Sequence, residues 1–297
     1  MGSYRLRPPN RLRKGSVLLF CLWATAALAT TGIAQARRVA LQVRWLDRQQ
    51  EERQAWFLAY SAIQGAQAIL AADDSERDGL QEAWGQEVKQ PYPLGPGTFV
   101  YTIQDEQSRL PINVLTQDLL TRLPGMTLPL AQKVIEERLL GHRILHPAQL
   151  RFFGLMSSED LQELGELVTC ASSGPVNLNT APKEVLLRLG LSPVLIDQLL
   201  LYRSGPDATA GTGDDRFFER SDSAYLVTVL HDAIGYSITP EDQATLSTLS
   251  SGGAALLGVK SNFFRIEGLG MTQAHGIQKK IMAVVDREGH RWGWNES

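Results

Sequence analysis

The sequence predicts an α+β protein, with a long N-terminal helix packed on an antiparallel sheet and a large all-helical insertion between the strands. Three observations lead to this prediction. An uncharged apolar stretch lies near the start of the chain, a helical pattern follows it without a break, and β-rich segments stand on both sides of a helix-rich middle. The 297 residues are enough for one large domain or two moderate ones.

Composition excludes a wholly disordered chain, because 43% of the residues are hydrophobic and 21% are charged. Five Lys and Arg residues and no acid precede Ser16; without them, 24 basic residues face 32 acidic ones, a net charge of −8. A phosphate-binding protein would favour the opposite sign. Cys21 lies in the apolar stretch and Cys170 far downstream, so no disulfide framework is expected, and Cys170 is interpreted as a small buried hydrophobe.

The first element is the stretch 16–36, which contains no charged residue and is long enough for a helix to cross a hydrocarbon core of about 30 Å. The basic leader places its start on the cytoplasmic side, although Arg37 and Arg38 weaken that orientation. Two interpretations compete. Either Ala34-Gln35-Ala36 is the cleavage site of a secretory signal, or only the leader is removed, after Gly15, and the apolar segment stays as an anchor.

The next segment, 37–74, favours the anchor. It contains no proline and a single glycine, and it keeps apolar residues at helical spacing. The apolar and amphipathic segments therefore form one predicted helix, whereas a cleaved signal would meet a break and an independent domain.

The β-rich segments bracket the middle of the chain. Residues 98–103 are β-branched and aromatic and predict a strand, and residues 263–268 and 276–285 predict two more, with 292–294 as an edge strand. Helical patterns dominate between them, from about residue 112 to 251. The helical region is therefore expected to be an insertion into one sheet.

The insertion contains an internal repeat. Residues 112–116 (INVLT) align with 176–180 (VNLNT), and a pair of helices follows each segment. Further on, Ser157 and Thr239 are predicted helix N-caps, each with acids in the first turn. The two copies share one order of elements, and the second is longer mainly through an acidic loop.

These elements divide the chain into predicted parts. They are a basic leader (1–15), a transmembrane segment (16–36), the rest of the helix with the first strands (37–111), the helical insertion (112–251, with repeats 112–172 and 175–251) and the C-terminal strands (252–297).

Lys14-Gly15 followed by Ser16-Val17-Leu18-Leu19-Phe20, the long helix and the inner VNLNTAP stretch (176–182) carry a resemblance to a known family. The chain resembles type IV pilin-like proteins and, among them, the K-type minor pseudopilins of type II secretion systems (general secretion pathway protein K). The likeness covers nearly the whole chain. It implies cleavage between Gly15 and Ser16 by a prepilin peptidase, with methylation of the new amino terminus. Phe20 stands where most pilins have glutamate, and this departure is typical of the K type.

The resemblance implies a structural role and no enzymatic one: a subunit at the tip of the periplasmic pseudopilus that helps initiate its assembly for export of folded proteins. It implies a single-pass inner-membrane protein with most of the chain in the periplasm. The implied partners are the I-, J- and H-type minor pseudopilins, the major pseudopilin, the prepilin peptidase, the inner-membrane assembly platform, and the secretin or exported substrates.

The alternative is a membrane-anchored DNA-binding protein for DNA uptake, because each repeat half resembles a helix-hairpin-helix of the SAM-like kind. That motif needs a tight turn with two glycines that exposes amides to a phosphate. Thr127 and Ser192 stand where the second glycine is needed, and residues 113–203 hold eight basic against nine acidic side chains. We therefore expect no nucleic-acid partner.

The loop 205–216 concentrates acids among glycines, which suits a hard cation. It is not an EF-hand, because the glutamate at the twelfth place is missing. The K-type resemblance also implies calcium in the helical domain. Asp207, Asp214 and Asp215 are the predicted ligands, with Glu219 and Asp222 as weaker candidates. The alternative is a solvated Asp-rich turn.

No catalytic pattern emerges from the sequence. The five histidines are scattered, without a metal-binding pair on one helical turn. Asp105, Glu106 and Arg109 are expected to form ion pairs and turn contacts where the strand meets the insertion. A third hypothesis, a secreted soluble domain released after Ala36, names no activity.

Overall fold

The computed structural model describes residues 13–73, 76–86, 90–154, 156–251 and 255–296. The chain forms two compact units, Met1–Arg53 and Gln54–Ser297. Helix α1 (Arg13–Ala72) contains 60 residues and belongs to both units, which confirms the predicted long N-terminal helix. Most of the leader lies outside the described residues.

The second unit is built on a five-stranded sheet with the order β1-β2-β7-β8-β9, in which all neighbours are antiparallel. The strands are β1 (Tyr92–Leu94), β2 (Gly97–Asp105), β7 (Phe263–Thr272), β8 (Gln278–Asp286) and β9 (Arg291–Glu296). Strands β2 and β7 are neighbours in the sheet and are separated in sequence by the helical region. The predicted α+β class, with helices added to an antiparallel sheet, is confirmed.

The C-terminal half of α1 packs on this sheet through small residues. Ala55, Ala59, Ala62 and Ala66 have no exposed surface, and the facing positions of β7 are Gly268 and Gly270. A Cβ atom on Gly268 would lie 2.5 Å from the carbonyl oxygen of Ala59, and one on Gly270 would lie 2.2 Å from that of Ala55. Glycine in β7 and alanine in α1 thus bring the helix backbone against the strand. Larger side chains, among them Trp84 and Phe264, fill the rest of this core.

The helical region follows β2 as two modules of the same design. After the 3₁₀ turn η1 (Glu106–Ser108), the first contains β3 (Leu110–Pro111), α2 (Gln117–Thr121), α3 (Leu128–Leu139), the 3₁₀ helix η2 (Pro147–Phe152), α4 (Ser158–Leu167) and β4 (Val168–Thr169). The second contains β5 (Val176–Asn177), α5 (Lys183–Arg188), α6 (Pro193–Arg203), α7 (Ser223–Ile234), α8 (Pro240–Ser250) and β6 (Leu257–Gly258). Each module closes on a parallel two-stranded pair, β3 with β4 and β5 with β6.

The contacts of the two modules set the register of the repeat. The Asn113 side chain donates to the Ile144 carbonyl and accepts from its N–H, at 2.9 and 2.8 Å. Asn179 makes the same pair of bonds with Phe218, at 3.1 and 2.8 Å. Asn113 therefore corresponds to Asn179, two residues beyond the Asn177 of the sequence alignment. The sequence alignment was therefore wrong by two residues. The segment VNLN has asparagine at two positions that are two residues apart, which is the side-chain period of a strand, and the alignment chose the first of them.

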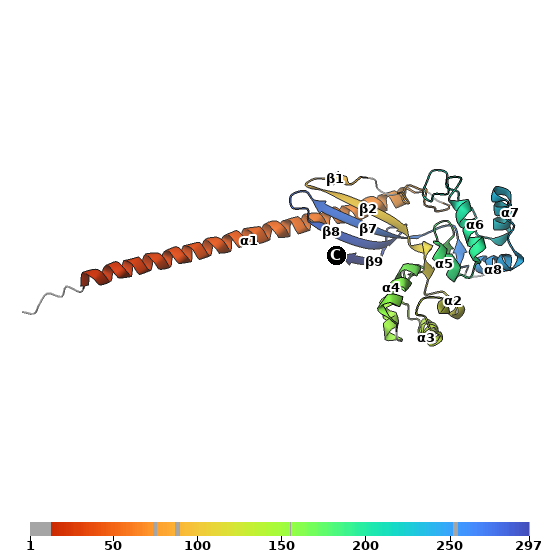
Figure 1. The fold of residues 1–297 in the computed structure, drawn as a ribbon, viewed down its shortest axis with the longest axis horizontal. Coiled ribbons are helices and arrows are strands. Elements are labelled where there is room, and N and C mark those ends of the chain that lie inside the picture. Colours follow the sequence, from red (N-terminus) through yellow and green to blue (C-terminus); the bar gives the residue numbers. More distant parts are fainter. Residues whose placement is uncertain (1–12, 74–75, 87–89, 155, 252–254, 297) are drawn as a thin grey trace, which may run out of the picture. The chain divides into compact units, whose positions relative to one another are not determined.

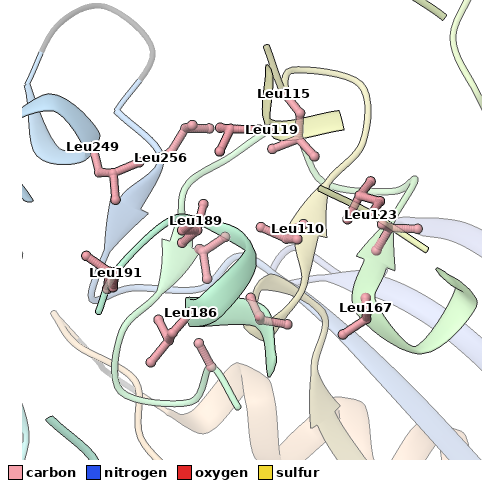
Figure 2. Close-up of a cluster of buried hydrophobic side chains, with 14 of the residues drawn as sticks. Leu110, Leu115, Leu119, Leu123, Leu167, Leu186, Leu189, Leu191, Leu249 and Leu256 are labelled. Carbon is pink, nitrogen blue, oxygen red and sulfur yellow. The ribbon is translucent and has the colours of Figure 1, made fainter. Parts of the chain in front are cut away.

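The later equivalences agree with the sequence. Ser157 and Thr239 are the N-caps of α4 and α8, and their hydroxyls accept from the N–H groups of Asp160 and Asp242. Leucines of both modules meet in one core, drawn in Figure 2, which shows Leu110 and Leu123 of the first module with Leu186 and Leu189 of the second. Figure 1 shows the helices α2 to α8 grouped at the end of the sheet where β2 ends.

Candidate functional site

The described part of the first unit is the N-terminal part of α1, and its apolar side chains are exposed. Val17, Leu18, Leu22 and Trp23 have between 62 and 71% of their surface free. From Ser16 onward, α1 is long and apolar enough to cross a membrane, as judged by length and composition. The helix continues through the Ala34–Ala36 positions, where the signal-peptide interpretation places its cleavage site. An uninterrupted helix at that point favours an anchor.

The predicted processing point lies at the start of α1. Gly15 and Ser16 fall within the first turns of the helix. Phe20 follows one turn later and is 67% exposed. A phenyl ring at that position adds apolar surface and no charge, so this turn of the helix needs no ionic partner in a membrane. Cleavage and methylation at this point stay predictions.

The acidic loop between α6 and α7 is closed by its own aspartates. The Asp207 N–H donates to Asp214 Oδ2 at 3.1 Å, and the Gly211 N–H donates to Asp215 Oδ2 at 2.7 Å. The Thr212 hydroxyl donates to Asp214 Oδ1 at 2.6 Å, and this bond lowers the pKa of Asp214. The turn also depends on Gly205, whose φ is +62° and whose Cα lies against the Asp214 carbonyl.

The three loop aspartates share one short segment and supply the hard oxygens that calcium prefers. Their carboxylates are engaged with loop donors and do not converge within 4.8 Å as a set of three. The weaker candidates face elsewhere: Glu219 pairs with Arg77 at 3.2 Å, and Asp222 caps α7 and pairs with Arg220 at 2.8 Å. The donor chemistry fits a cation, and binding would exchange the loop hydrogen bonds for metal contacts.

A different acidic group does converge, and sequence reasoning missed it. Among the described residues, Asp73, Asp78 and Glu82 bring carboxylate oxygens within 4.8 Å of one another. Arg287 forms ion pairs with Asp73, at 3.1 Å, and with Asp78. The guanidinium supplies the positive charge that these acids need, and burial raises the pKa of Glu82. We interpret the group as an ionic junction between Arg287, just after β8, and the segment after α1.

The turn of the second helical hairpin, between α5 and α6, is filled by protein groups. Asp242 of α8 accepts from the Ser192 N–H at 3.2 Å and from its hydroxyl at 2.8 Å. A nucleic-acid phosphate would need the same amide. At Gly190, whose φ is +93°, an added Cβ would lie 2.2 Å from Arg122 Nη1, so a guanidinium of the first module covers this turn.

The first hairpin has the equivalent acid in the same place. Gly125 has a φ of +64°, and a Cβ there would lie 2.7 Å from Asp160 Cβ. Asp160 Oδ2 accepts from the Ser157 hydroxyl at 2.7 Å. In both modules an acid from the fourth helical element therefore contacts the hairpin. Asp160 lies at the glycine of the first hairpin, and Asp242 accepts from an amide of the second. This arrangement opposes the DNA-binding alternative, because the carboxylate takes the place of a phosphate and repels one.

The junction between the sheet and the second module centres on Asp105. Its Oδ2 accepts from the Thr180 hydroxyl at 2.5 Å, from the Ser261 hydroxyl at 2.6 Å and from Asn177 Nδ2 at 3.0 Å. Its Oδ1 accepts from the Gln107 N–H at 2.7 Å. Burial raises the pKa of Asp105 to about 6, and the four hydrogen bonds oppose that rise.

Glu106 and Arg109 form the ion pairs expected beside Asp105. Glu106 pairs with Arg109 at 3.6 Å and with Arg265 of β7 at 2.9 Å, and its side chain is 3% exposed. The nearby Cys170 is partly buried against the hydrophobic core, and burial raises the pKa of its thiol to about 12. These groups fasten the strand to the insertion, and their contacts are structural.

A comparison with solved structures finds a protein of similar fold. A chain of the crystal structure of the GspK–GspI–GspJ complex from the enterotoxigenic Escherichia coli type 2 secretion system superimposes with a TM-score of 0.60. The superposition covers 85% of this chain and 99% of that chain, at 16% sequence identity. No family model matches the sequence, and no curated protein matches it significantly. The likeness shows that the two chains share a fold.

Proposed function

We propose that this chain is a minor pseudopilin of the K type in a type II secretion system, with an assembly role and no enzymatic one. The observation that carries the proposal is the likeness over 99% of a chain from the GspK–GspI–GspJ complex. The long apolar helix, which has the dimensions of a membrane anchor, supports the same role. The proposed location is the inner membrane, with the second unit in the periplasm.

The proposed partners are other pseudopilins, beginning with the I and J types named in that complex. Their counterpart on this chain is the exposed apolar face of α1, which would pack against neighbouring helices in a filament. Phe20 supports a place at the tip. A subunit with no neighbour beyond it has no amine to neutralise, so an apolar residue costs nothing there. The H-type and major pseudopilins, the prepilin peptidase, the assembly platform, and the secretin or exported proteins complete the proposed set.

We also propose that the loop 205–216 holds calcium through Asp207, Asp214 and Asp215. The loop carries three carboxylates within nine residues and closes on itself through the bond from the Asp207 N–H to Asp214. A bound calcium ion would balance the three carboxylates, against which the loop itself sets one cation, Arg216. These three aspartates would then hold the connection between α6 and α7 in place. The base of that connection is already closed by a backbone hydrogen bond of 2.9 Å from the Arg216 N–H to the Arg203 carbonyl.

The mature amino terminus tests the proposal. Mass spectrometry of the chain purified from membranes should find an N-methylated Ser16, produced by cleavage after Gly15. A chain that begins at Arg37 in the soluble fraction would mean an ordinary signal peptide and would end the pseudopilin proposal.

A deletion strain separates the assembly role from DNA uptake. Without the gene, exported proteins should accumulate in the periplasm, and a Gly15→Ala change that blocks processing should give the same defect. Normal export would count strongly against the proposal. The DNA-binding alternative predicts salt-dependent binding of duplex DNA by the purified chain, and no binding at low salt would exclude it.

A further inference from the structure

Residues 138–152 run from the end of α3 through η2 in the first module, and they expose apolar side chains. These are the four most exposed large hydrophobic residues among the described part of the second unit: Phe152 at 87%, Leu139 at 83%, Leu145 at 72% and Leu140 at 69%. Phe57 follows at 61%. Water-exposed leucine and phenylalanine side chains in one segment indicate a surface that a partner covers.

The backbone beneath these side chains is firmly held. Asn113 clamps Ile144 through two hydrogen bonds of 2.9 and 2.8 Å. Gln149 Oε1 accepts from the N–H groups of Leu145 and His146, at 2.7 and 3.3 Å. Ile144 is buried, while Leu145 beside it points outward. The segment is therefore built to present its apolar side chains.

The charge of this segment differs from that of its counterpart in the second module. Arg138 and Arg203 correspond, because each donates from α3 or α6 to a carbonyl just before the first helix of its module, that of Leu115 or Ala181. Ser157 and Thr239 correspond as the N-caps of α4 and α8, so residues 138–157 match 203–239. The first stretch contains three arginines, two histidines and no acid. The second contains three arginines and six acids. Two copies of one design thus carry net charges of +3 and −3, within a chain whose overall charge is negative.

A groove of about 480 Å³ lies beside Leu139. Val114, Ile135 and Leu139 form part of its lining, and Arg138, His142 and Arg143 add cationic or polar groups to it. His142 lies 2.7 Å from Glu137, and Arg138 donates to the Leu115 carbonyl at 2.6 Å. Arg143 is exposed and makes no ion pair within the part of the chain that the structure describes. Its guanidinium is available to a carboxylate of a partner.

We propose that the 138–152 segment and this groove bind a partner protein through a polypeptide stretch that carries both acidic and apolar side chains. The apolar residues of that stretch would pack against Leu139 and Leu145, and an acid would pair with Arg143. A lipid surface is the less suitable occupant. Membrane-binding basic clusters contain about four to eight Lys or Arg, whereas here Arg138 and Arg151 are bonded within the protein. This surface goes beyond the proposed pilus role and does not depend on it.

The test uses the full chain in nanodiscs of neutral lipid and a fluorescent synthetic peptide in which Glu alternates with Leu and Phe. Fluorescence anisotropy should show that this peptide binds about tenfold more tightly than the same peptide with Lys in place of Glu. Arg143→Glu and Leu145→Ser should each weaken binding about fivefold or more. The matched controls Arg220→Glu and Leu201→Ser, at exposed positions of the second module, should leave the affinity within about twofold.

Equal affinity for the two peptides, or unchanged binding by Arg143→Glu, would overturn the proposal. A second measurement tests whether a lipid surface, rather than a protein, occupies this segment. An environment-sensitive fluorophore on Leu145→Cys, in a Cys21→Ser and Cys170→Ala background, reports whether position 145 enters lipid. A blue shift in vesicles with anionic lipid, absent in neutral vesicles, would assign the segment to a membrane surface and also overturn the proposal. No shift, together with selective peptide binding, would support it.

Discussion

Asp242, in the first turn of α8, accepts hydrogen bonds from both the backbone N–H and the hydroxyl of Ser192, at 3.2 and 2.8 Å. The two residues are 50 positions apart, and their contact joins the last helix of the second module to its hairpin. Asp242 is 5% exposed, so water cannot replace it at the Ser192 amide without local opening. The pair therefore holds the module together at the place where a DNA-binding hairpin would hold a phosphate.

Removal of this carboxylate should destabilise the second module. Asp242→Ala leaves the partly buried Ser192 N–H without its acceptor and removes the bond from Thr239, and such losses cost about 1–3 kcal/mol. For a unit of this size, each kcal/mol lowers the melting temperature by about 2–4 °C. Circular dichroism of the full chain in detergent measures the shift. Asp232→Ala, at an exposed position of α7, is the matched control and should change little; equal shifts for both would refute the argument.

The close contact between α1 and β7 leads to a second prediction. Gly268→Ala places a methyl group 2.5 Å from the Ala59 carbonyl oxygen, which is backbone and cannot swing aside. The helix must move from the sheet, at a cost of about 1–3 kcal/mol or more. Thermal unfolding followed by tryptophan fluorescence reports it, because Trp84 is buried in this core.

Gly293→Ala provides the control for that experiment. A Cβ at Gly293 of β9 would lie 3.5 Å from the Val284 side chain, an ordinary contact. This variant should melt within about 2 °C of the wild-type chain. If Gly268→Ala melts at the same temperature as Gly293→Ala, α1 does not approach β7 as closely as described.

The sequence predicted those parts of the fold that are encoded locally. The alternating residues of β2 and β7, the unbroken pattern of α1 and the caps at Ser157 and Thr239 each depend on neighbours within a few positions. The register of the repeat was missed because Asn177 and Asn179 offer the same side chain two residues apart. Their roles differ only in space: Asn179 clamps Phe218, and Asn177 reaches Asp105 and Ser261.

The candidate sites were likewise predictable only where their residues are close together in the sequence. The acids of the loop 205–216 are adjacent in sequence, so their grouping was predictable from the sequence. Asp78 and Arg287 pair across 209 positions, and Asp78 also accepts from the Ser261 N–H across 183. A single sequence carries no periodicity that links such positions. The converging acids Asp73, Asp78 and Glu82 therefore escaped sequence reasoning.

Asp105 leads to a prediction about pH. Its pKa is about 6 when folded, against 3.8 as the ordinary value, so the folded state binds its proton more tightly than the unfolded state. The stability from this group is fully present below pH 3.8 and is lost as the pH rises through about 6. Between pH 7 and pH 4 the gain amounts to about 2 kcal/mol.

Asp105→Asn isolates that contribution from the other titrating groups. The variant keeps one acceptor and loses the titration, so its melting temperature should lack the part of the pH dependence due to Asp105. We expect the wild-type chain to gain about 4–8 °C relative to Asp105→Asn when the pH is lowered from 7 to 4. A constant difference between the two proteins would mean that Asp105 keeps its ordinary pKa.

Calcium binding to the acidic loop is the last prediction. Asp207, Asp214 and Asp215 accept hydrogen bonds from loop amides and Thr212, and the loop contains one cation, Arg216, against their three negative charges. A calcium ion that draws these oxygens together would stabilise only the folded loop. At 100 times its dissociation constant it would add about 2.7 kcal/mol to the free energy of unfolding. Calcium should therefore raise the melting temperature of the chain after treatment with a chelator, and magnesium should do so less because it demands a stricter geometry.

Variants distinguish the loop from the converging acids near Arg287. Asp214→Asn keeps the size of the side chain and removes one charged ligand, so it should abolish most of the calcium-dependent shift. Glu82→Gln should retain that shift, because Glu82 already accepts from Trp84 Nε1 at 2.8 Å and from the Gly79 N–H at 3.1 Å. A shift lost in Glu82→Gln and kept in Asp214→Asn would move the cation to the junction of Asp73, Asp78 and Glu82. Equal melting temperatures with calcium and with chelator would leave the loop as a solvated turn, closed by Thr212 and its own amides.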